Sequence, residues 1–302
     1  MEMIEIWSHT LFYLLIMFIG YFFKKIHLLK KEDSQILATI IMNLTLPCVF
    51  FSSAKGIVLD ISMLELMIIG LVSNLLMIVL GYVFMRKDSD LMKGTYMIAC
   101  SGYDVGNFVL PFVTAFFSGI GVIYLCSFNI TNTIMSLGVT YAIAYYVVNK
   151  KNDLKIKDFL KQLFSSISLD VYVLIIILAI LHIDIPDVLI NVTSKIGSVN
   201  TFLVMMMIGL KLEFHFNFSH VQHIISILGM RFVGAIILTI ITYLLPLPIL
   251  AKKVIILAYF GPLVSVSSIY AKKLGYDGEI VAESTTLSIL LSMIMSSIIL
   301  SL

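Results

Sequence analysis

Charged residues are scarce in this chain, and the scarcity extends over its whole length. Only 13% of the 302 residues are charged, whereas 60% are hydrophobic, and the mean hydropathy is +1.05. A soluble domain keeps roughly 25% charged residues to cover its surface. Most of this chain must therefore face lipid or other apolar helices, which excludes a soluble fold and predicts an all-α polytopic membrane protein.

Cysteine is also rare, and a basic N-terminal region is missing. Cys48, Cys100 and Cys126 each lie inside an apolar run, so we interpret them as small core residues and not as a disulfide set or a metal site. The start of the chain, Met1-Glu-Met-Ile-Glu5, is acidic and is not typical of a cleavable signal peptide. The first apolar run is therefore expected to remain as a helix.

Catalytic motifs are lacking as well. The chain has no His-Glu-x-x-His zinc helix, no Gly-x-Ser-x-Gly elbow and no Gly-x-x-x-x-Gly-Lys-Ser/Thr phosphate loop. The pair Tyr103-Asp104 is similar to an element of intramembrane aspartyl proteases, but that chemistry needs two aspartates sharing a proton, and no Gly-x-Gly-Asp partner occurs. With no filter loop or signalling domain either, a secondary transporter is favoured over an enzyme, a channel or a receptor. No cofactor and no nucleic-acid partner are expected.

Long apolar runs are abundant instead. A membrane-spanning helix needs about 20 mostly apolar residues. The segments that meet this requirement are residues 5–23, 34–53, 61–85, 94–117, 120–148, 165–183, 187–210, 219–245, 250–271 and 278–301. The sequence therefore predicts ten transmembrane helices.

The basic residues of the loops alternate between the two sides of these helices. Fifteen of the 20 Lys and Arg residues fall on one side and four on the other, and Arg231 lies inside a helix. Because positively charged loops stay in the cytoplasm, we expect a protein of the cell (inner) membrane with both termini outside.

The longest hydrophilic stretch, from Asn149 to Lys161, lies at the middle of the chain. It separates a first five-helix unit, residues 1–148, from a second, residues 164–302, with residues 149–163 as a cytoplasmic linker. An odd number of helices in each unit places the two units in opposite orientations in the membrane. This is the requirement for an inverted repeat, a common transporter architecture.

The fourth helix of each unit carries glycine and proline near its middle. The first unit has Gly106 and Pro111, and the second has Gly261-Pro262. Proline removes a helical hydrogen bond, and a freed backbone group at membrane depth is tolerated where it is buried or lines a watery cavity. Both helices are predicted to be unwound near these residues and to cross at mid-membrane, although a simple kink explains each one taken alone.

Motifs with the same order and spacing resemble those of the auxin efflux carrier family, which includes malate permeases and the PIN-type auxin carriers. They are Asn43-Leu-Thr-Leu-Pro47, Asp104-Val-Gly106-Asn107-Phe-Val-Leu-Pro111, Phe128-Asn129-Ile-Thr-Asn132, Gly261-Pro262, Ala271-Lys-Lys-Leu-Gly275 and Ser284-Thr-Thr-Leu-Ser288. The resemblance implies two inverted repeats of five helices, crossing broken helices, and transport of organic anions by alternating access. This chain differs from the usual family pattern at Asp104, Asn129 and Val266, where Asn, Asp and Asn are common.

The substrate site is predicted at the crossing of the two broken helices. The expected substrate-binding residues are Asp104, Gly106, Asn107, Asn132, Gly261 and Ser265, and the expected broken-helix prolines are Pro111 and Pro262. Secondary candidates are Asn43, Asn129, Arg231 and Ser267. The expected partners are a small organic anion, such as malate or an auxin-like acid, and membrane lipids. Coupling to H⁺ is expected, with coupling to Na⁺ as the alternative, and a homodimeric state is left open.

Several of these residues have a second interpretation. A carboxylate at the bilayer centre costs several kcal/mol unless it is neutral or paired, so Asp104 is either a coupling group or a protonated side chain with one hydrogen bond. Arg231 cannot be neutralised, so it snorkels to the surface, pairs with an acid such as Asp104 or attracts an anion. The asparagines bind substrate or join helices. Glu283 and His220 are expected to reach water, and no metal site is expected.

Overall fold

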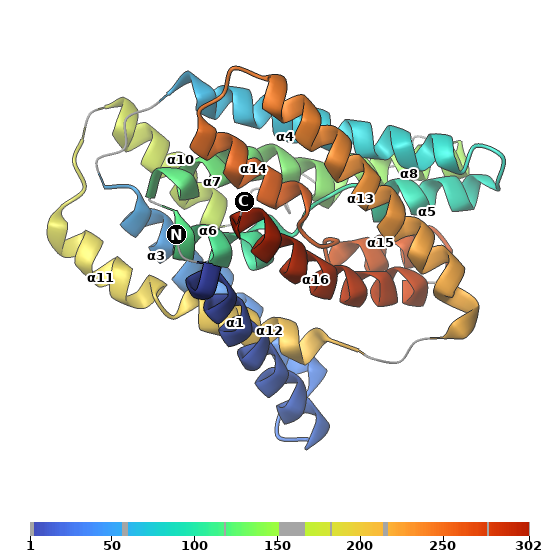
Figure 1. Cartoon of the computed structure of the whole chain (residues 1–302), viewed down its shortest axis with the longest axis horizontal. Coiled ribbons are helices and arrows are strands. Elements are labelled where there is room, and N and C mark those ends of the chain that lie inside the picture. The colour runs from blue at the N-terminus through green and yellow to red at the C-terminus, as the bar shows by residue number, and fades with distance from the viewer. Residues whose placement is uncertain are drawn as a thin grey trace.

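Helices make up the secondary structure of the part of the chain that the computed structural model describes, which is residues 3–55, 60–117, 119–150, 167–181, 183–213, 217–276 and 278–301 (Figure 1). Within these ranges there is no strand. A helix satisfies its own backbone hydrogen bonds, so it is the element that long apolar runs form in lipid.

The first half of the chain folds into elements whose bounds follow the predicted segments closely. They are α1 (Met3–Lys25), η1 (Lys31–Asp33), α2 (Ser34–Ile40), η2 (Ile41–Thr45), α3 (Leu46–Ser53), α4 (Ile61–Phe84), α5 (Asp90–Cys100), η3 (Val105–Val109), α6 (Leu110–Phe116), α7 (Gly119–Ile134), η4 (Met135–Val139) and α8 (Thr140–Asn149). The elements η2, η3 and η4 are single turns of π-helix.

The described part of the second half is also helical. Its elements are α10 (Ile167–Ile180), α11 (Asp187–Gly197), α12 (Asn200–Lys211), η5 (Phe218–His220), α13 (Val221–Leu244), α14 (Ile249–Tyr259), α15 (Val266–Lys273) and α16 (Gly278–Ser301). Apart from Asn149 and Lys150, the predicted linker over residues 149–163 lies outside the described residues.

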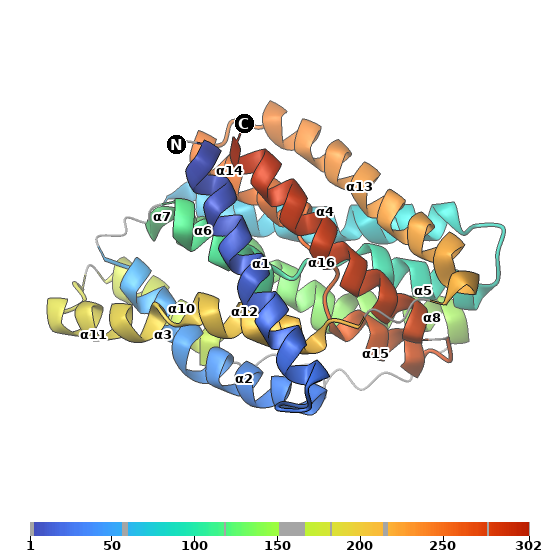
Figure 2. The ribbon, with the colours of Figure 1, turned by 60° about the horizontal axis from the view of Figure 1, so that its bottom comes forward.

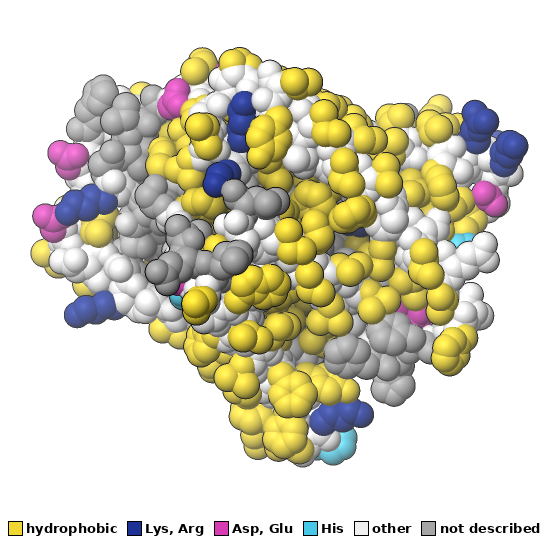
Figure 3. Space-filling view, viewed as in Figure 1, with side chains coloured by type: hydrophobic (Ala, Val, Ile, Leu, Met, Phe, Trp, Pro, Cys, Tyr) yellow, Lys and Arg dark blue, Asp and Glu magenta, His cyan; other side chains and the backbone are white. Residues whose placement is uncertain are grey.

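Seven helical segments of the described chain are long and apolar enough to cross a membrane. They are Ile4–Lys25, Lys31–Ser53, Ile61–Phe84, Gly119–Asn149, Asp187–Lys211, Phe218–Leu244 and Gly278–Ser301. Hydrophobic side chains cover most of the face seen in Figure 3, and charged side chains gather mainly toward its margins. The chain is therefore a multi-pass helical membrane protein.

Of the three remaining predicted segments, two are divided into shorter helices. Residues 94–117 are divided between α5, η3 and α6, and residues 250–271 between α14 and α15. The segment 165–183 corresponds to α10, of which 14 residues are described. Each of these pieces is shorter than the roughly 20 residues that a single spanning helix needs.

The helices pack into two groups, best separated in Figure 2. In the first group α1 packs on α12, and α3 packs on α10 and α11. In the second group α4 packs on α5 and α7, α13 on α14 and α16, and α5 on α8. The two groups meet where α3 contacts α7 and where α1 contacts α16. The start of α1 and the end of α16 lie beside each other, at the top of the view in Figure 2.

Glycine allows the closest of these contacts, between α1 and α12. A Cβ atom added at Gly20 would lie 2.5 Å from the Met206 carbonyl oxygen, and one added at Gly209 would overlap the Met17 carbonyl oxygen. Small residues at helix crossings let backbones approach and gain van der Waals contact, which is the main attraction between helices in lipid. The two helices therefore touch backbone to backbone.

Candidate functional site

The break between α5 and η3 begins one residue after Cys100. Ser101 is extended, and Gly102 has φ +78°, a conformation that favours glycine because it has no Cβ. A Cβ there would also lie 2.8 Å from Ser136 Oγ. The chain turns helical again at Val105, so the unwound residues are 101–104.

This break lies earlier than the sequence pattern predicted, because residues 106–111 are helical. Gly106 is inside η3, and Pro111 is in the first turn of α6. Because η3 continues directly into α6, Pro111 lies inside a helical stretch that begins at Val105, and the π-helical turn immediately precedes it. The prediction of unwinding at Gly106–Pro111 was therefore wrong by a few residues, and Gly102 is the glycine that the break requires.

The second break lies where it was expected. The helix α14 ends at Tyr259 and α15 begins at Val266, so the unwound stretch contains Gly261 and Pro262. The backbone N–H of Leu263 donates to Ser288 Oγ of α16 at 3.1 Å. A side chain from a neighbouring helix thus replaces a helical partner, which satisfies the freed backbone group.

The two breaks touch each other directly. The backbone N–H of Asp104 donates to the Pro262 carbonyl oxygen at 3.0 Å, although the two residues belong to opposite halves of the chain. The two unwound segments therefore meet within the second helix group, and their meeting point is called the crossing below.

Arg231 of α13 joins the helix ends at this crossing. Its Nη1 donates to the carbonyl oxygens of Cys100 at 2.8 Å and Gly102 at 3.0 Å, and its Nη2 donates to the Gly261 carbonyl oxygen at 3.0 Å. The guanidinium thus lies at the C-terminal ends of α5 and α14, where the helix dipoles favour a cation. Arg231 is 7% exposed, so its side chain does not snorkel to the surface. Within the described residues its hydrogen bonds go to carbonyl oxygens and not to Asp104.

Two buried asparagines satisfy the unwound backbone of the first break. The N–H of Gly102 donates to Asn74 Oδ1 at 2.8 Å, and the N–H of Tyr103 donates to Asn132 Oδ1 at 3.1 Å. Asn132 Nδ2 in turn donates to the Tyr103 carbonyl oxygen at 2.8 Å. Asn132 therefore holds the break in place with most of its hydrogen-bonding capacity. Asn74 was not singled out from the sequence, although an asparagine inside the apolar run 61–85 is the signal that could have found it.

Asp104 caps the helix that follows the break. Its Oδ1 accepts a hydrogen bond from Asn107 Nδ2 at 2.8 Å and faces the Asn107 backbone N–H at 3.4 Å. Aspartate is among the preferred N-cap residues because its carboxylate takes one of the unpaired N–H groups. The carboxylate therefore occupies the position at which another anion would meet this helix N-terminus.

A cavity of about 190 Å³ lies against this break. It is bounded by the first helix group through Met42, Leu46 and Phe50 and by the second group through residues of η3, α7 and η4. Of the predicted site residues, the cavity is lined by Asp104, Gly106, Asn107, Asn129 and Asn132, together with Thr133 and Ser136. Among its described lining residues there is one acidic side chain and no Lys, Arg or His.

The other predicted residues do not line this cavity. Asn43 is exposed, and its Nδ2 donates to Thr39 of its own helix at 2.9 Å. Ser265 is exposed, whereas Ser267 is buried and its Oγ lies 3.5 Å from the Ile98 carbonyl oxygen. Gly261 and Pro262 contribute carbonyl oxygens to the crossing, as described above. Of the predicted residues, the structure therefore brings together those at η3 and α7 and leaves Asn43, Ser265 and Ser267 away from the cavity.

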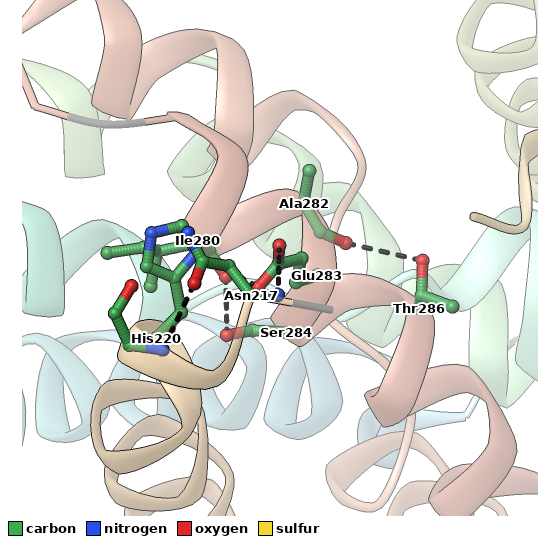
Figure 4. Close-up of polar contacts among 8 residues, drawn as sticks. Asn217, His220, Ile280, Ala282, Glu283, Ser284 and Thr286 are labelled. Carbon is green, nitrogen blue, oxygen red and sulfur yellow. Dashed lines mark hydrogen bonds and ion pairs between the residues drawn. The ribbon is translucent and has the colours of Figure 1, made fainter. Parts of the chain in front are cut away.

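A buried pair lies elsewhere, between η5 and α16 (Figure 4). His220 Nδ1 and Glu283 Oε2 are 3.1 Å apart, and both side chains are only 11% exposed. The backbone N–H of Asn217 also faces Glu283, at 3.4 Å from Oε1. The expectation that His220 and Glu283 reach water was therefore wrong, because each provides the other with a polar partner and together they join the start of α13 to α16.

The chain matches no protein-family model and no curated protein. The resemblance to auxin efflux carriers thus depends on the motifs quoted above, and it stays a prediction.

Replacing Asn132 by leucine is expected to destabilise the protein. The N–H and carbonyl groups of Tyr103 would each lose a buried partner, at about 1–3 kcal/mol for each unsatisfied group. Thermal unfolding of the purified protein should show a Tm several degrees below that of the parent. The matched control is Asn43→Leu, which changes an exposed asparagine bonded only to its own helix and should leave the Tm unchanged. Equal Tm values for the two variants would contradict the role assigned to Asn132.

Proposed function

We propose that this protein is a secondary transporter that moves small organic anions across the membrane by alternating access, coupled to protons. The observation that carries the proposal is the direct contact of two interrupted helices beside a cavity. Interrupted helices in corresponding positions of two halves are the best pointer to a transporter binding site, because unwound backbone and helix ends provide ligands at mid-membrane.

We further propose ten membrane-crossing segments in two inverted repeats of five. The helix pairs support this division, because α1 packs on α12 and α10 packs on α3. Each contact joins the first helix of one half to the second segment of the other. The pairs α4·α5 and α13·α14 also correspond, and so do α4·α7 and α13·α16. Such reciprocal contacts are expected when the two halves are related by a two-fold axis in the membrane plane.

The position of the cavity supports alternating access. Its walls come from both helix groups, with Met42 and Phe50 on one side and Asn107 and Asn132 on the other. A relative movement of the two groups would therefore open the cavity alternately to each side of the membrane, as expected of rocking transporters.

The helix N-terminus at Asp104 supports an anionic substrate. The described lining of the cavity has no cation, so an anion would be bound by backbone N–H groups and the partial positive charge of the helix end. Ionised Asp104 occupies this position and repels such an anion. A proton on Asp104 removes the repulsion and turns the carboxyl into a donor, so proton and anion would favour each other's binding.

Transport by the purified protein in proteoliposomes tests this function. Radiolabelled acetate, benzoate and malate would be supplied outside, with an inward proton gradient. Accumulation of one or more of these acids above the level in protein-free liposomes is expected, because neutral acetic and benzoic acid also cross a bare bilayer, and a protonophore should abolish this excess. If folded protein accumulates none of them, with a proton gradient or with a sodium gradient, the proposal is wrong.

Cysteine labelling in intact cells tests the proposed orientation. Cys48, Cys100 and Cys126 are buried, so each is replaced by alanine to provide a background without reactive thiols. In that background, Lys253→Cys is expected to react with a membrane-impermeant maleimide from outside, and Lys87→Cys is expected to react only after the cells are opened. Both lysines are exposed, so accessibility alone does not distinguish them. Labelling of Lys87→Cys from outside would refute the orientation.

A further inference from the structure

A second cavity lies between α13, α14 and α16, with a volume of about 410 Å³. Among the described residues it shares no lining residue with the cavity at Asp104. Leu228, Phe232 and Leu291 contribute apolar walls, and Arg231 and Ser292 also line it. The volume is within the usual range of small-molecule sites, which are mostly apolar with a few well-placed polar groups.

This second cavity opens toward lipid and not toward water. Phe232 and Leu291 on its rim are 45% and 49% exposed, and they belong to α13 and α16, which are both long and apolar enough to span the membrane. Arg231 lies near the middle of α13. A molecule that reaches the cavity must therefore come from the acyl-chain region of the bilayer.

Two polar groups in the cavity have unused hydrogen-bonding capacity. Within the described residues, Arg231 donates through Nη1 and Nη2, so its Nε–H is left without an acceptor. Ser292 is 5% exposed, and its hydroxyl forms no hydrogen bond with the described residues. Carbonyl oxygens solvate the guanidinium, but they do not neutralise its charge. A buried cation and a buried hydroxyl in one apolar cavity are complementary to an anion with oxygen acceptors.

We propose that this cavity binds an amphiphilic monocarboxylate that enters from the bilayer. The carboxylate would bind Arg231 and Ser292, and the alkyl chain would lie along Leu228, Phe232 and Leu291. A phospholipid headgroup does not fit this position, because it stays at the interface, about 15 Å from the bilayer centre. A carboxylic acid reaches that depth in its neutral form, and the proton that it releases on pairing with Arg231 returns to bulk water. Arg231 joins both breaks, so the bound acid would stabilise this conformation of the crossing. The acid would in this way regulate changes in the conformation of the crossing.

Binding of radiolabelled dodecanoate to the purified protein in nanodiscs tests the proposal, with dodecan-1-ol as an uncharged ligand of the same length. The parent should bind dodecanoate about tenfold or more tightly than dodecan-1-ol, because a charge-assisted hydrogen bond contributes roughly that factor. The variant Gly229→Leu is chosen to fill the cavity, since a Cβ at Gly229 meets nothing within 4 Å. It should weaken dodecanoate binding about tenfold or more. The control Val233→Leu, on the same helix outside the cavity, should change binding less than about twofold, since a surface substitution usually has little effect.

Three results would overturn this assignment. If Gly229→Leu binds dodecanoate as the parent does, the cavity is not the site. If dodecanoate and dodecan-1-ol bind equally and are lost equally in Gly229→Leu, the cavity takes an uncharged chain such as a lipid acyl tail. If Asp104→Asn abolishes dodecanoate binding and Gly229→Leu does not, the acid binds in the cavity at Asp104. The measurement is of binding alone, so it is independent of the proposed transport activity.

Discussion

The affinity of an Asp104→Asn variant for its organic anion is expected to be independent of pH. In the parent, Asp104 caps the helix N-terminus, and when Asp104 is ionised an anion would compete with it for the same N–H groups. Affinity should therefore fall as pH rises and Asp104 loses its proton, by about 5- to 150-fold if the coupling has the usual size of 1–3 kcal/mol. Asparagine is a permanently neutral donor, so the variant should keep the higher affinity at every pH.

The measurement is binding of the transported anion to purified protein across a pH series, with Asp170→Asn as the control. Asp170 is exposed on α10, so its substitution should leave the pH dependence of the parent unchanged. A variant Asp104→Asn that binds no anion, in a protein whose binding requires sodium, would show that Asp104 is a cation ligand. The oxygen atoms of Asn129, Thr133 and Ser136 in the same cavity are the type of ligand that a hard cation prefers.

Substitution of Arg231 by leucine is expected to cause the largest loss of stability. The carbonyl groups of Cys100, Gly102 and Gly261 would lose a charged donor at once. A hydrogen bond to a charged group contributes about 1.5–3 kcal/mol, so the total loss should be about 3 kcal/mol or more. Arg231→Lys should be intermediate, because lysine keeps the charge but lacks the planar fork that reaches both helix ends.

Unfolding of the purified protein by heat and by denaturant measures these losses. The control is Arg86→Leu, which removes an exposed arginine in the α4–α5 loop and should change stability by about 0.5 kcal/mol or less. If Arg231→Leu is as stable as this control, the carbonyl groups find other partners and Arg231 is not what holds the crossing together.

The uninterrupted helices could be predicted from the sequence because each depends only on residues within its own segment. A run of about 20 apolar residues is enough to require a helix in lipid, and α1, α4 and α16 begin and end within a few residues of the predicted segments. The first break could not be located in the same way. Glycine and proline mark where a helix is weak, but partners from α4 and α7 decide which residues unwind, and these contacts are invisible in sequence.

The candidate site was predictable where its residues are adjacent along the chain. Asp104, Gly106 and Asn107 follow one another at the break, and all three line the cavity. Arg231 was recognised as unusual, but its carbonyl partners come from two other helices, so sequence alone left three interpretations open. Asn43 was predicted as a site residue from its motif, but it lies away from the cavity. The motif does not reveal which face of the helix Asn43 occupies, and that face is exposed.

The contact between α1 and α12 limits how a molecule of this shape can move. At Gly20 and Gly209 the two backbones meet without intervening side chains, so sliding of one helix along the other would drive main-chain atoms into each other. These helices must therefore travel together as a single rigid body. The interface between α1 and α16 is of another kind, because side chains meet there and Thr10 and Ser297 share a hydrogen bond across it. A shift of α1 and α12 against α16 can therefore be absorbed by side-chain rearrangement.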